Sequence, residues 1–344
     1  MALLGSDGPG VPRKPLGEQR KLARACCFCG ESAFTKLLDA QSADAADEQF
    51  ELVECQNCHI VRTEPSLGDD TLEQYYGSSY YGSTERKFSL LVEVLTRWAN
   101  YYRAKSLLAT ARAGHSCSRS RPLRVLDIGC GRGSLLKALH RLGCECYGVE
   151  RENFRMADGS KDIRLYCQQL ETIHLGSSFF DVAIMWHSLE HMSNPSATLG
   201  EVARILTPGG LLVVAVPNFD SSQRRLFGAH WFHLDVARHT HHFGVQPLLN
   251  SLRAKGFRIL STTTFCFEQN PYAFVQSCLN ALTPRTMADA LYSSLKVQQN
   301  AVLRPSLLGW LGLAFLISPL ALAEYLVSGI LGVGATIGIR AERL

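Results

Sequence analysis

Lysine and arginine are not gathered into a long block anywhere in the sequence, and the net charge is small. There are 35 basic and 31 acidic residues, which gives a net charge of +4 with histidine neutral. Proteins that bind nucleic acid through its phosphates usually carry a concentrated basic patch or stripe. The composition therefore argues against nucleic acid as the main partner.

The first 24 residues contain no apolar run of the kind found in a secretory signal peptide. They are rich in glycine and proline and then basic, so we expect residues 1–24 to be disordered. Without a secretion signal, the twelve cysteines are expected to be free thiols or metal ligands rather than disulfides. The 344 residues, 46% of them hydrophobic, suffice for one domain of ordinary size plus smaller modules.

Four of the cysteines form two pairs of identical spacing, Cys26-x-x-Cys29 and Cys55-x-x-Cys58. Two thiolates on one tight turn can bind one edge of a tetrahedral zinc ion. Cys27 lies inside the first pair, but only Cys26 has the right offset. Four thiolates leave no open coordination position, so the predicted zinc is structural. Unrelated buried thiols and a redox pair are the alternatives.

A glycine-rich turn lies between an apolar strand, Val125–Ile128, and a segment with helical apolar spacing, 134–142. Its glycines are Gly129, Gly131 and Gly133. A strand, a glycine turn and a helix form a ligand-binding crevice, because the backbone can approach closely and the helix N-terminus favours electron-rich groups. A dinucleotide fingerprint needs its third glycine one position later, so this loop is of another kind.

The string Asp127-x-Gly-x-Gly-x-Gly resembles motif I of class I S-adenosylmethionine (SAM) methyltransferases. Later strings resemble further motifs of that family in the same order, and apolar strands alternating with helices indicate a parallel sheet covered on both faces. The resemblance covers about residues 122–265. It implies an α/β fold with a Rossmann-like seven-stranded sheet, here with an N-terminal zinc ribbon and an apolar C-terminal helical tail. The later strings are Phe180–Trp186, Leu206–Gly210 and Val216–Asn218.

The resemblance also implies a SAM site at the carboxyl ends of the strands. Glu150 ends a short strand about twenty residues after the loop, where such folds place the acid that binds the ribose hydroxyls. Gln168, Gln169 or the Leu170 backbone would meet the adenine. The predicted cofactor-binding residues are Asp127, Gly129, Gly131, Gly133, Glu150, Gln169, Leu170, Trp186 and His187.

His187, Glu190 and His191 follow the strand that ends at Trp186. On a helix, residues four apart share a face, so the two imidazoles would bracket an acceptor. Glu190-His191 also resembles the acid–histidine pair of ubiquinone-pathway O-methyltransferases, where it implies a divalent metal. Residues 192–195 lack the further acids of that family, so we assign no metal here. The alternative is a pair that only caps or packs the segment.

The segment Trp231–Phe243 resembles the W-x-x-L-D-x-P-R-H-x-x-H-F string of ribbon-bearing methyltransferases, with Ala237 in place of the proline. It would form the acceptor side of the pocket. His239 and His242 match the string, and a neutral imidazole is a natural base at neutral pH. A histidine-rich metal site is the alternative. The predicted catalytic residues are His187, Glu190, His191, His239 and His242.

The cysteine pairs resemble the N-terminal zinc ribbon of sugar and natural-product methyltransferases, whose ribbon is followed by a tyrosine-rich linker. Here Tyr75–Tyr81 occupies that place, either covering the substrate mouth or packing between the two parts. The expected organisation is a disordered N-terminus (1–24), a zinc ribbon (25–64), a Tyr-rich linker with helices (65–121), the SAM-binding domain (122–265), a helical extension (266–303) and a membrane-associated hairpin (304–344).

The hairpin is expected because no charge occurs from Leu307 to Ala323 or from Leu326 to Ile339. One membrane span needs about twenty apolar residues, so two full crossings do not fit. Arg304 and Arg340 flank the block, which favours entry and exit at the cytoplasmic face. A buried helical pair or a dimer interface is the alternative.

A methyltransferase held at the cytoplasmic membrane face is suited to lipid-linked acceptors. We expect O-methylation of a lipid-linked sugar or glycolipid, with a prenylated quinone or another small-molecule ring as the alternative. A non-catalytic protein with a degenerate domain is disfavoured by the intact loop and Glu150. A nucleic-acid methyltransferase is disfavoured because Met185–Ser188 stands where Asn/Asp-Pro-Pro-Tyr would be expected.

Overall fold

The computed structural model describes residues 25–42, 48–66, 72, 75, 90–113, 121–150, 162–283, 289, 291–292 and 305–344. At its centre is the predicted seven-stranded sheet, in the order β10-β11-β8-β7-β4-β5-β6. The strands from β4 to β8 are parallel, whereas β11 is antiparallel to both β8 and β10. The strands are β4 (Arg124–Ile128), β5 (Glu145–Val149), β6 (Arg164–Tyr166), β7 (Phe180–Trp186), β8 (Leu206–Pro217), β10 (Phe257–Thr263) and β11 (Thr336–Arg343).

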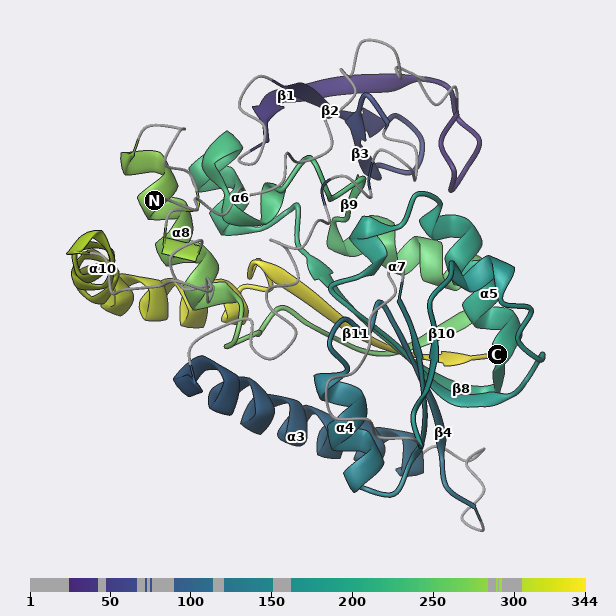
Figure 1. The fold of residues 1–344 in the computed structure, drawn as a ribbon. Coiled ribbons are helices and arrows are strands. Elements are labelled where there is room, and N and C mark those ends of the chain that lie inside the picture. The colour runs from purple at the N-terminus through teal and green to yellow at the C-terminus, as the bar shows by residue number, and fades with distance from the viewer. Residues whose placement is uncertain are drawn as a thin grey trace, which may run out of the picture.

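Helices cover both faces of this sheet (Figure 1). Successive residues of β7 alternate between the two faces, with Ala183 and Met185 in one buried apolar cluster and Val182 and Ile184 in the other. Since both faces are buried, β7 is apolar from Val182 to Trp186. One cluster includes α5 (Pro195–Ile205) and α7 (Val245–Ala254), and the other includes α3 (Leu90–Ala113) and α4 (Ser134–Arg141).

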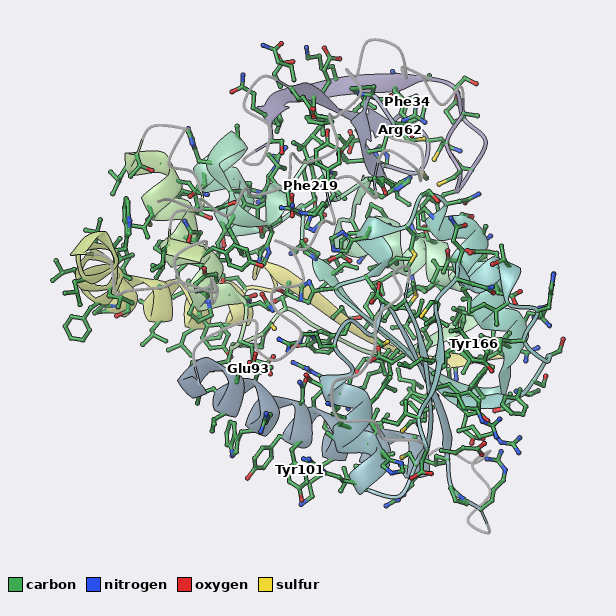
Figure 2. All side chains as sticks on the ribbon, in the orientation of Figure 1. Phe34, Arg62, Glu93, Tyr101, Tyr166 and Phe219 are labelled. Carbon is green, nitrogen blue, oxygen red and sulfur yellow. The ribbon has the colours of Figure 1, made fainter. Side chains whose placement is uncertain are left out.

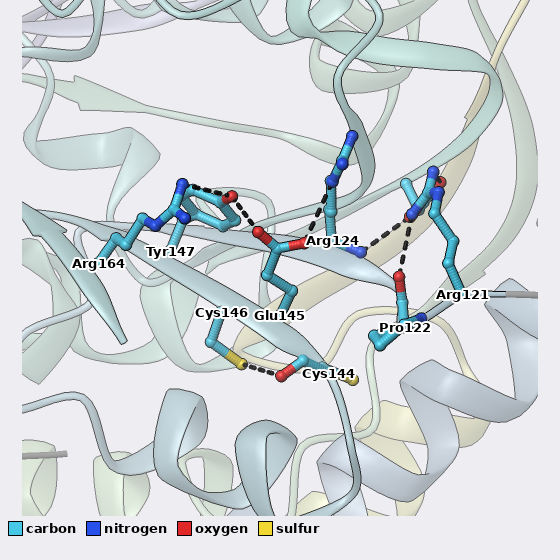
Figure 3. A network of polar contacts seen from close by, with 9 residues as sticks. Arg121, Pro122, Arg124, Cys144, Glu145, Cys146, Tyr147 and Arg164 are labelled. Carbon is cyan, nitrogen blue, oxygen red and sulfur yellow. Dashed lines mark hydrogen bonds and ion pairs between the residues drawn. The ribbon is translucent and has the colours of Figure 1, made fainter. Parts of the chain in front are cut away.

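Polar side chains join the amino ends of the parallel strands (Figure 3). Glu145 of β5 accepts hydrogen bonds from Arg124 Nε and from the hydroxyl of Tyr147, and Arg164 Nη1 of β6 donates to that hydroxyl. Asp181 at the start of β7 accepts a hydrogen bond from the Arg124 backbone N–H at 2.8 Å. These contacts hold β4 to β7 in register at the edge opposite to the predicted cofactor site.

A second sheet is built on the N-terminal cysteine unit, which we define as the described residues 25–42 and 48–66. Its strands β1 (Phe34–Gln41), β2 (Gln49–Cys55) and β3 (Val61–Glu64) are antiparallel, and β9 (His241–His242) is its fourth strand. The guanidinium of Arg62 lies 3.8 Å from the ring centroid of Phe34 (Figure 2). The segment expected to be a separate ribbon, 25–64, is therefore completed by the predicted acceptor segment.

The prediction of a membrane hairpin over 304–344 is wrong. The segment is one helix, α10 (Pro305–Ile330), followed by β11, which lies between β8 and β10 in the central sheet. Gly332 turns the chain at φ +71°, and Ile337 and Ile339 then enter the core on one face. The domain built on the central sheet consequently extends beyond the expected limit at residue 265.

α10 packs on α8 (Asn270–Leu282), the described part of the helical extension, and lies at the margin of the molecule (Figure 1). Residues 1–24 and Tyr76–Tyr81 lie outside the described residues, so the predicted disorder and the tyrosine cluster are not placed by the structure. Within the described part of the chain, the remaining elements are α6 (Ser222–Phe227) and short 3-10 turns at Leu170–Thr172, Leu189–His191, Gly228–His230 and Phe232–Leu234.

Candidate active site

A cavity opens at the carboxyl ends of β4, β5 and β7. Six of the predicted cofactor residues line it: Gly129, Gly131, Glu150, Gln169, Leu170 and His187. The other lining residues are Ile128, Val149, Gln168, Glu171, Ser188, His191, Met192, Ser193 and Thr198. The predicted residues Asp127, Gly133 and Trp186 belong to the same segments but are not part of this lining. In open α/β sheets, ligands bind at this edge.

The three glycines of the loop all have positive φ, and Gly129 also leaves no room for a side chain. Gly129 has a φ of +73°, and a Cβ there would lie 2.5 Å from the Cβ of Ser188. The backbone N–H of Gly131 donates a hydrogen bond to Glu150 Oε2 at 2.7 Å, so the loop and the predicted ribose-binding acid are in direct contact. Gly133, at φ +67°, precedes the first turn of α4.

Asp127 is buried below this loop, with 4% of its surface exposed. Burial and the negative charge of Glu150 raise the pKa of its carboxyl to about 7, against the opposing effect of Arg103. The Arg103 guanidinium lies 3.8 Å from the ring centroid of Trp186 and pairs with Glu268. Arg103 is not among the residues predicted from the sequence, because nothing in the local sequence of α3 shows that it lies beside the carboxyl end of β7.

His187 and His191 both line the cavity, but not through a shared face of an α-helix. His187 takes a left-handed conformation, φ +53°, directly after β7, and only Leu189–His191 forms a single 3-10 turn. The expected i, i+4 geometry is therefore wrong, although both imidazoles reach the same cavity. A non-glycine residue held at positive φ is a strained position of the kind found at functional sites.

Glu190 and His187 form a buried ion pair. Oε1 of Glu190 lies 3.3 Å from Nδ1 of His187, and Glu190 is 1% exposed. Burial by itself lowers the pKa of His187, but hydrogen bonding to Cys266 and Glu190 outweighs burial and raises the pKa to about 9. Burial by itself raises the pKa of Glu190, but the hydrogen bond from His187 and the neighbouring imidazoles lower it to about 2. Both partners are therefore charged at neutral pH.

His191 is neutral at the same pH, because burial lowers the pKa of its imidazole to about 4. Its Nδ1 lies 3.2 Å from the carbonyl oxygen of Arg238. A carbonyl only accepts hydrogen bonds, so Nδ1 carries the proton and Nε2 has a lone pair. By the same argument His239, whose Nδ1 lies 2.9 Å from the carbonyl of His233, has its proton on Nδ1 when neutral. The rings of His191 and His239 are 4.6 Å apart, centroid to centroid.

One ligand atom from each of Glu190, His191 and His239 lies within 4.8 Å of the others. One carboxylate oxygen and two imidazole nitrogens are suitable donors for a divalent transition metal. The metal implied by the resemblance to ubiquinone-pathway enzymes would be held by these three residues. The charge of Glu190 is, however, already compensated by His187, so a dication would enter a site that is electrically balanced without it.

His242 and His233 complete the histidine cluster but do not line the cavity. His242 is 4% exposed, its ring lies 6.2 Å from that of His239, and its Nε2 is 3.0 Å from the hydroxyl of Thr63. His233 is stacked on His187 at 6.1 Å, and its Nε2 has no hydrogen-bond partner among the described residues. In the sequence His233 is only an extra residue of the matched string, so its contact with His187 could not be predicted.

The four predicted zinc ligands also come together. The sulfur atoms of Cys26, Cys29, Cys55 and Cys58 all lie within 4.8 Å of one another, and two of the contacts, Cys26–Cys58 and Cys29–Cys55, are 3.5 Å. Tetrahedral zinc with bonds of about 2.3 Å requires sulfur–sulfur distances of about 3.8 Å. The arrangement therefore fits a zinc ion, and the ion itself stays a prediction.

Comparison with known proteins agrees with the fold. The family described as a methyltransferase domain matches residues 97–262, which run from α3 through β10. Residues 97–262 are therefore similar to this family over slightly less than half of the chain.

The domain is similar to ubiquinone biosynthesis O-methyltransferases. The protein from Bradyrhizobium sp. is 33% identical over 128 residues, covering 35% of this chain and 50% of the relative. The protein from Mesorhizobium japonicum is 29% identical over 179 residues, covering 47% of this chain and 71% of the relative. The chain thus spans about half the length of several curated relatives that it matches.

Among solved structures, the Burkholderia thailandensis 1,6-didemethyltoxoflavin-N1-methyltransferase, determined with S-adenosylhomocysteine, is similar with a TM-score of 0.44. It is 14% identical, and the match covers 85% of this chain and 95% of that one.

Proposed function

We propose that the protein is a SAM-dependent methyltransferase that methylates an oxygen atom of its acceptor. The observation that carries this proposal is the contact between the Gly131 N–H and Glu150 at the floor of a cavity that His187 and His191 also line. The loop and Glu150 form a place for a nucleoside, and the histidines lie at the same opening. When bound there, SAM would supply an electrophilic methyl group.

The chain must then position the acceptor and remove its hydroxyl proton. His191 suits the second task, because its imidazole is neutral and its Nε2 has a lone pair. His187 is unsuited as a base, because its imidazole already carries a proton at neutral pH. The ion pair with Glu190 holds His187 at the cavity wall, where its charge stabilises a negatively charged acceptor oxygen. His239 lies against His191, and His242 lies behind His239.

The four-cysteine group is proposed to hold one structural zinc ion. Its role is to fix the two turns in which the cysteines lie, where Gly30 N–H donates to the Cys26 carbonyl and His59 N–H donates to the Cys55 carbonyl. Because structural zinc contributes directly to the free energy of folding, its removal is expected to unfold this part of the chain.

We further propose that the acceptor is borne by a membrane at its cytoplasmic face. The segment Leu308–Ile330 is, within the described part of the chain, long and apolar enough to span a bilayer, and 17% of its most apolar window is buried. Its inner side is held by the protein, since Ala321 is fully buried and Glu324 accepts hydrogen bonds from Ser222 and Gln223 of α6. Phe315 and Leu316 are 77% and 74% exposed. These contacts favour a helix that lies along the bilayer surface.

The loop that contains Phe265 and Phe267 lies between the apolar surface of α10 and the active site. Phe267, 67% exposed, and Phe265 both contact the ring of Tyr325 on α10. Between them in the sequence, Cys266 lies beside His187 and contributes to the raised pKa of its imidazole. A lipid-linked acceptor held at this surface would therefore lie close to the cavity. The ubiquinone-pathway relatives favour a prenylated ring over the lipid-linked sugar or glycolipid that the sequence suggested.

The acceptor is tested with the full-length, reduced protein and methyl-labelled SAM. A long-chain prenylated catechol in lipid vesicles is compared with a short-chain analogue and a polyprenyl-linked sugar. We expect transfer to the catechol oxygen, faster for the long-chain form. The double variant Phe315→Glu/Leu316→Glu should lose vesicle binding and the long-chain advantage while it still methylates the short-chain analogue. If only the polyprenyl-linked sugar were methylated, the acceptor would be a sugar and not a prenylated ring. Equal rates for the long-chain and short-chain catechols would contradict the proposal that the acceptor is borne by a membrane.

A further inference from the structure

The N-terminal cysteine unit and the histidine segment are joined by one strand pair. β3 begins three residues after Cys58 and pairs with β9, so that Val61 faces His242 and Arg62 faces His241. The Thr63 N–H also donates to the carbonyl of Thr240 at 3.0 Å. The position of β3 consequently determines the position of the backbone that carries His239 and His242.

The hydroxyl of Thr63 holds both of these histidines. Thr63 is 5% exposed, and its Oγ1 donates to the carbonyl oxygen of His239 at 2.8 Å. The same oxygen lies 3.0 Å from Nε2 of His242. A hydroxyl has a single proton, and the carbonyl takes it, so Nε2 of His242 must be the donor in the second bond. Thr63 thereby fixes His242 in the tautomer with the proton on Nε2.

The neighbouring histidine is fixed in the opposite tautomer. Thr240 Oγ1 donates to the carbonyl of Met192 at 2.7 Å and lies 3.0 Å from Nδ1 of His241. Nδ1 of His241 is therefore the donor, and its Nε2 has a lone pair that faces Cys27 Sγ at 3.5 Å. Both histidines thus contact the N-terminal unit through a defined nitrogen. Such outer contacts orient the groups that they touch and tune their basicity.

We propose that Thr63 is a positioning residue, through which the N-terminal cysteine unit holds His239 against Glu190 and His191. The proposal deepens the proposed function and rests on it for its effect on catalysis. In this proposal the N-terminal cysteine unit supports the active site structurally, and its proposed zinc ion takes no part in the reaction. The folded unit keeps β3 in place, and β3 keeps the Thr63 hydroxyl between His239 and His242.

The tautomers are measured by nitrogen-15 NMR on full-length protein with labelled histidine, and the His242 signals are assigned from their loss in His242→Gln. Wild-type His242 should show the Nε2–H tautomer, and Thr63→Ser should retain it. Thr63→Val, which keeps the volume and lacks the hydroxyl, should lose it. Thr336→Val is the matched control, because the buried Thr336 hydroxyl has no hydrogen-bond partner among the described residues.

Kinetics with the short-chain prenylated catechol should then show kcat lower by about tenfold or more in Thr63→Val. SAM affinity should be unchanged, and Thr63→Ser should restore most of kcat. An Nδ1–H tautomer in wild-type His242 would overturn the proposal even if Thr63→Val failed to fold, as would equal behaviour of the serine and valine variants. The NMR measurement of the tautomers does not require turnover. An inactive wild-type protein would therefore count against the proposed function, and the spectra would still test whether Thr63 positions the histidines.

Discussion

Ile339 of β11 is the antiparallel partner of Val214 of β8, in the interior of the central sheet. Ile339 is 1% exposed and Val214 is fully buried. The segment that follows the apolar helix α10 is therefore part of the catalytic core, and α10 is connected to the active-site domain at this strand.

Deletion of residues 305–344 is expected to abolish cooperative folding, because β8 and β10 would both lose the strand between them. The single change Ile339→Ala should cost about 2–5 kcal/mol of unfolding free energy by leaving a cavity. Thermal unfolding followed by circular dichroism, together with SAM calorimetry, measures both effects. A truncated protein that unfolds cooperatively and binds SAM would contradict the assignment of β11 to the core.

Gly129→Ala should disrupt the cofactor loop. The new Cβ would meet the Ser188 Cβ at 2.5 Å, in addition to the cost of a left-handed alanine, about 1–2 kcal/mol. Gly143→Ala is the matched control, because Gly143 has a similar φ of +85° and a Cβ added there would have no contact within 4 Å. We expect both variants to lower the unfolding free energy but only Gly129→Ala to lose SAM affinity in calorimetry. Equal SAM binding by the two variants would show that Ser188 can move aside.

Acid should destabilise the protein in the range where histidine normally titrates. Burial and the charge of His187 lower the pKa of His233 to about 3, so the folded state stays neutral while the unfolded state takes up a proton near pH 6.5. The unfolded state then binds more protons, and stability falls as the pH drops from about 6.5 towards 3. His233→Phe keeps a ring against His187 and should make this dependence shallower, as measured by chemical denaturation at several pH values. An unchanged slope would show that His233 does not stay neutral in the folded protein.

Metal analysis of freshly purified, reduced protein should find one zinc ion per chain. Cys29→Ser and Cys58→Ser should lose the ion and lower the melting temperature, because they remove ligands from a structural site. His239→Gln should retain it. A second equivalent of metal that disappears in His239→Gln would instead place a cation on Glu190, His191 and His239, and would make His191 a ligand rather than a base.

The parts of the fold that the sequence predicts well are those coded by short, continuous segments. β7 forms at the expected residues because every position except Asp181 is apolar, and α4 begins at Ser134 directly after a glycine with positive φ. The four clustered cysteines, the predicted zinc ligands, could be named because each pair lies on one turn. The position of Glu150 relative to the loop followed from the βαβ unit alone.

What the sequence could not show depends on contacts between distant segments. The run from Leu326 to Ile339 is uncharged whether it forms a hairpin in a bilayer or a helix end followed by a buried strand, and only pairing with β8 distinguishes the two. His239 reaches Glu190 because β9 joins β3 in a second sheet, which no local pattern indicates. Arg103 is placed beside Trp186 only by the packing of α3 on the sheet.

The most direct test of the SAM site is a calorimetric titration of SAM into the full-length, reduced protein, alongside Glu150→Ala and Glu171→Ala. Glu171 also lines the cavity, but its carboxylate accepts a hydrogen bond from Thr198 rather than from the glycine loop. We predict one SAM site per chain. Glu150→Ala should weaken SAM binding by about tenfold or more, where each factor of ten corresponds to about 1.4 kcal/mol. Glu171→Ala should have a smaller effect. Absence of SAM binding by the wild-type protein, or unchanged affinity in Glu150→Ala, would contradict this assignment.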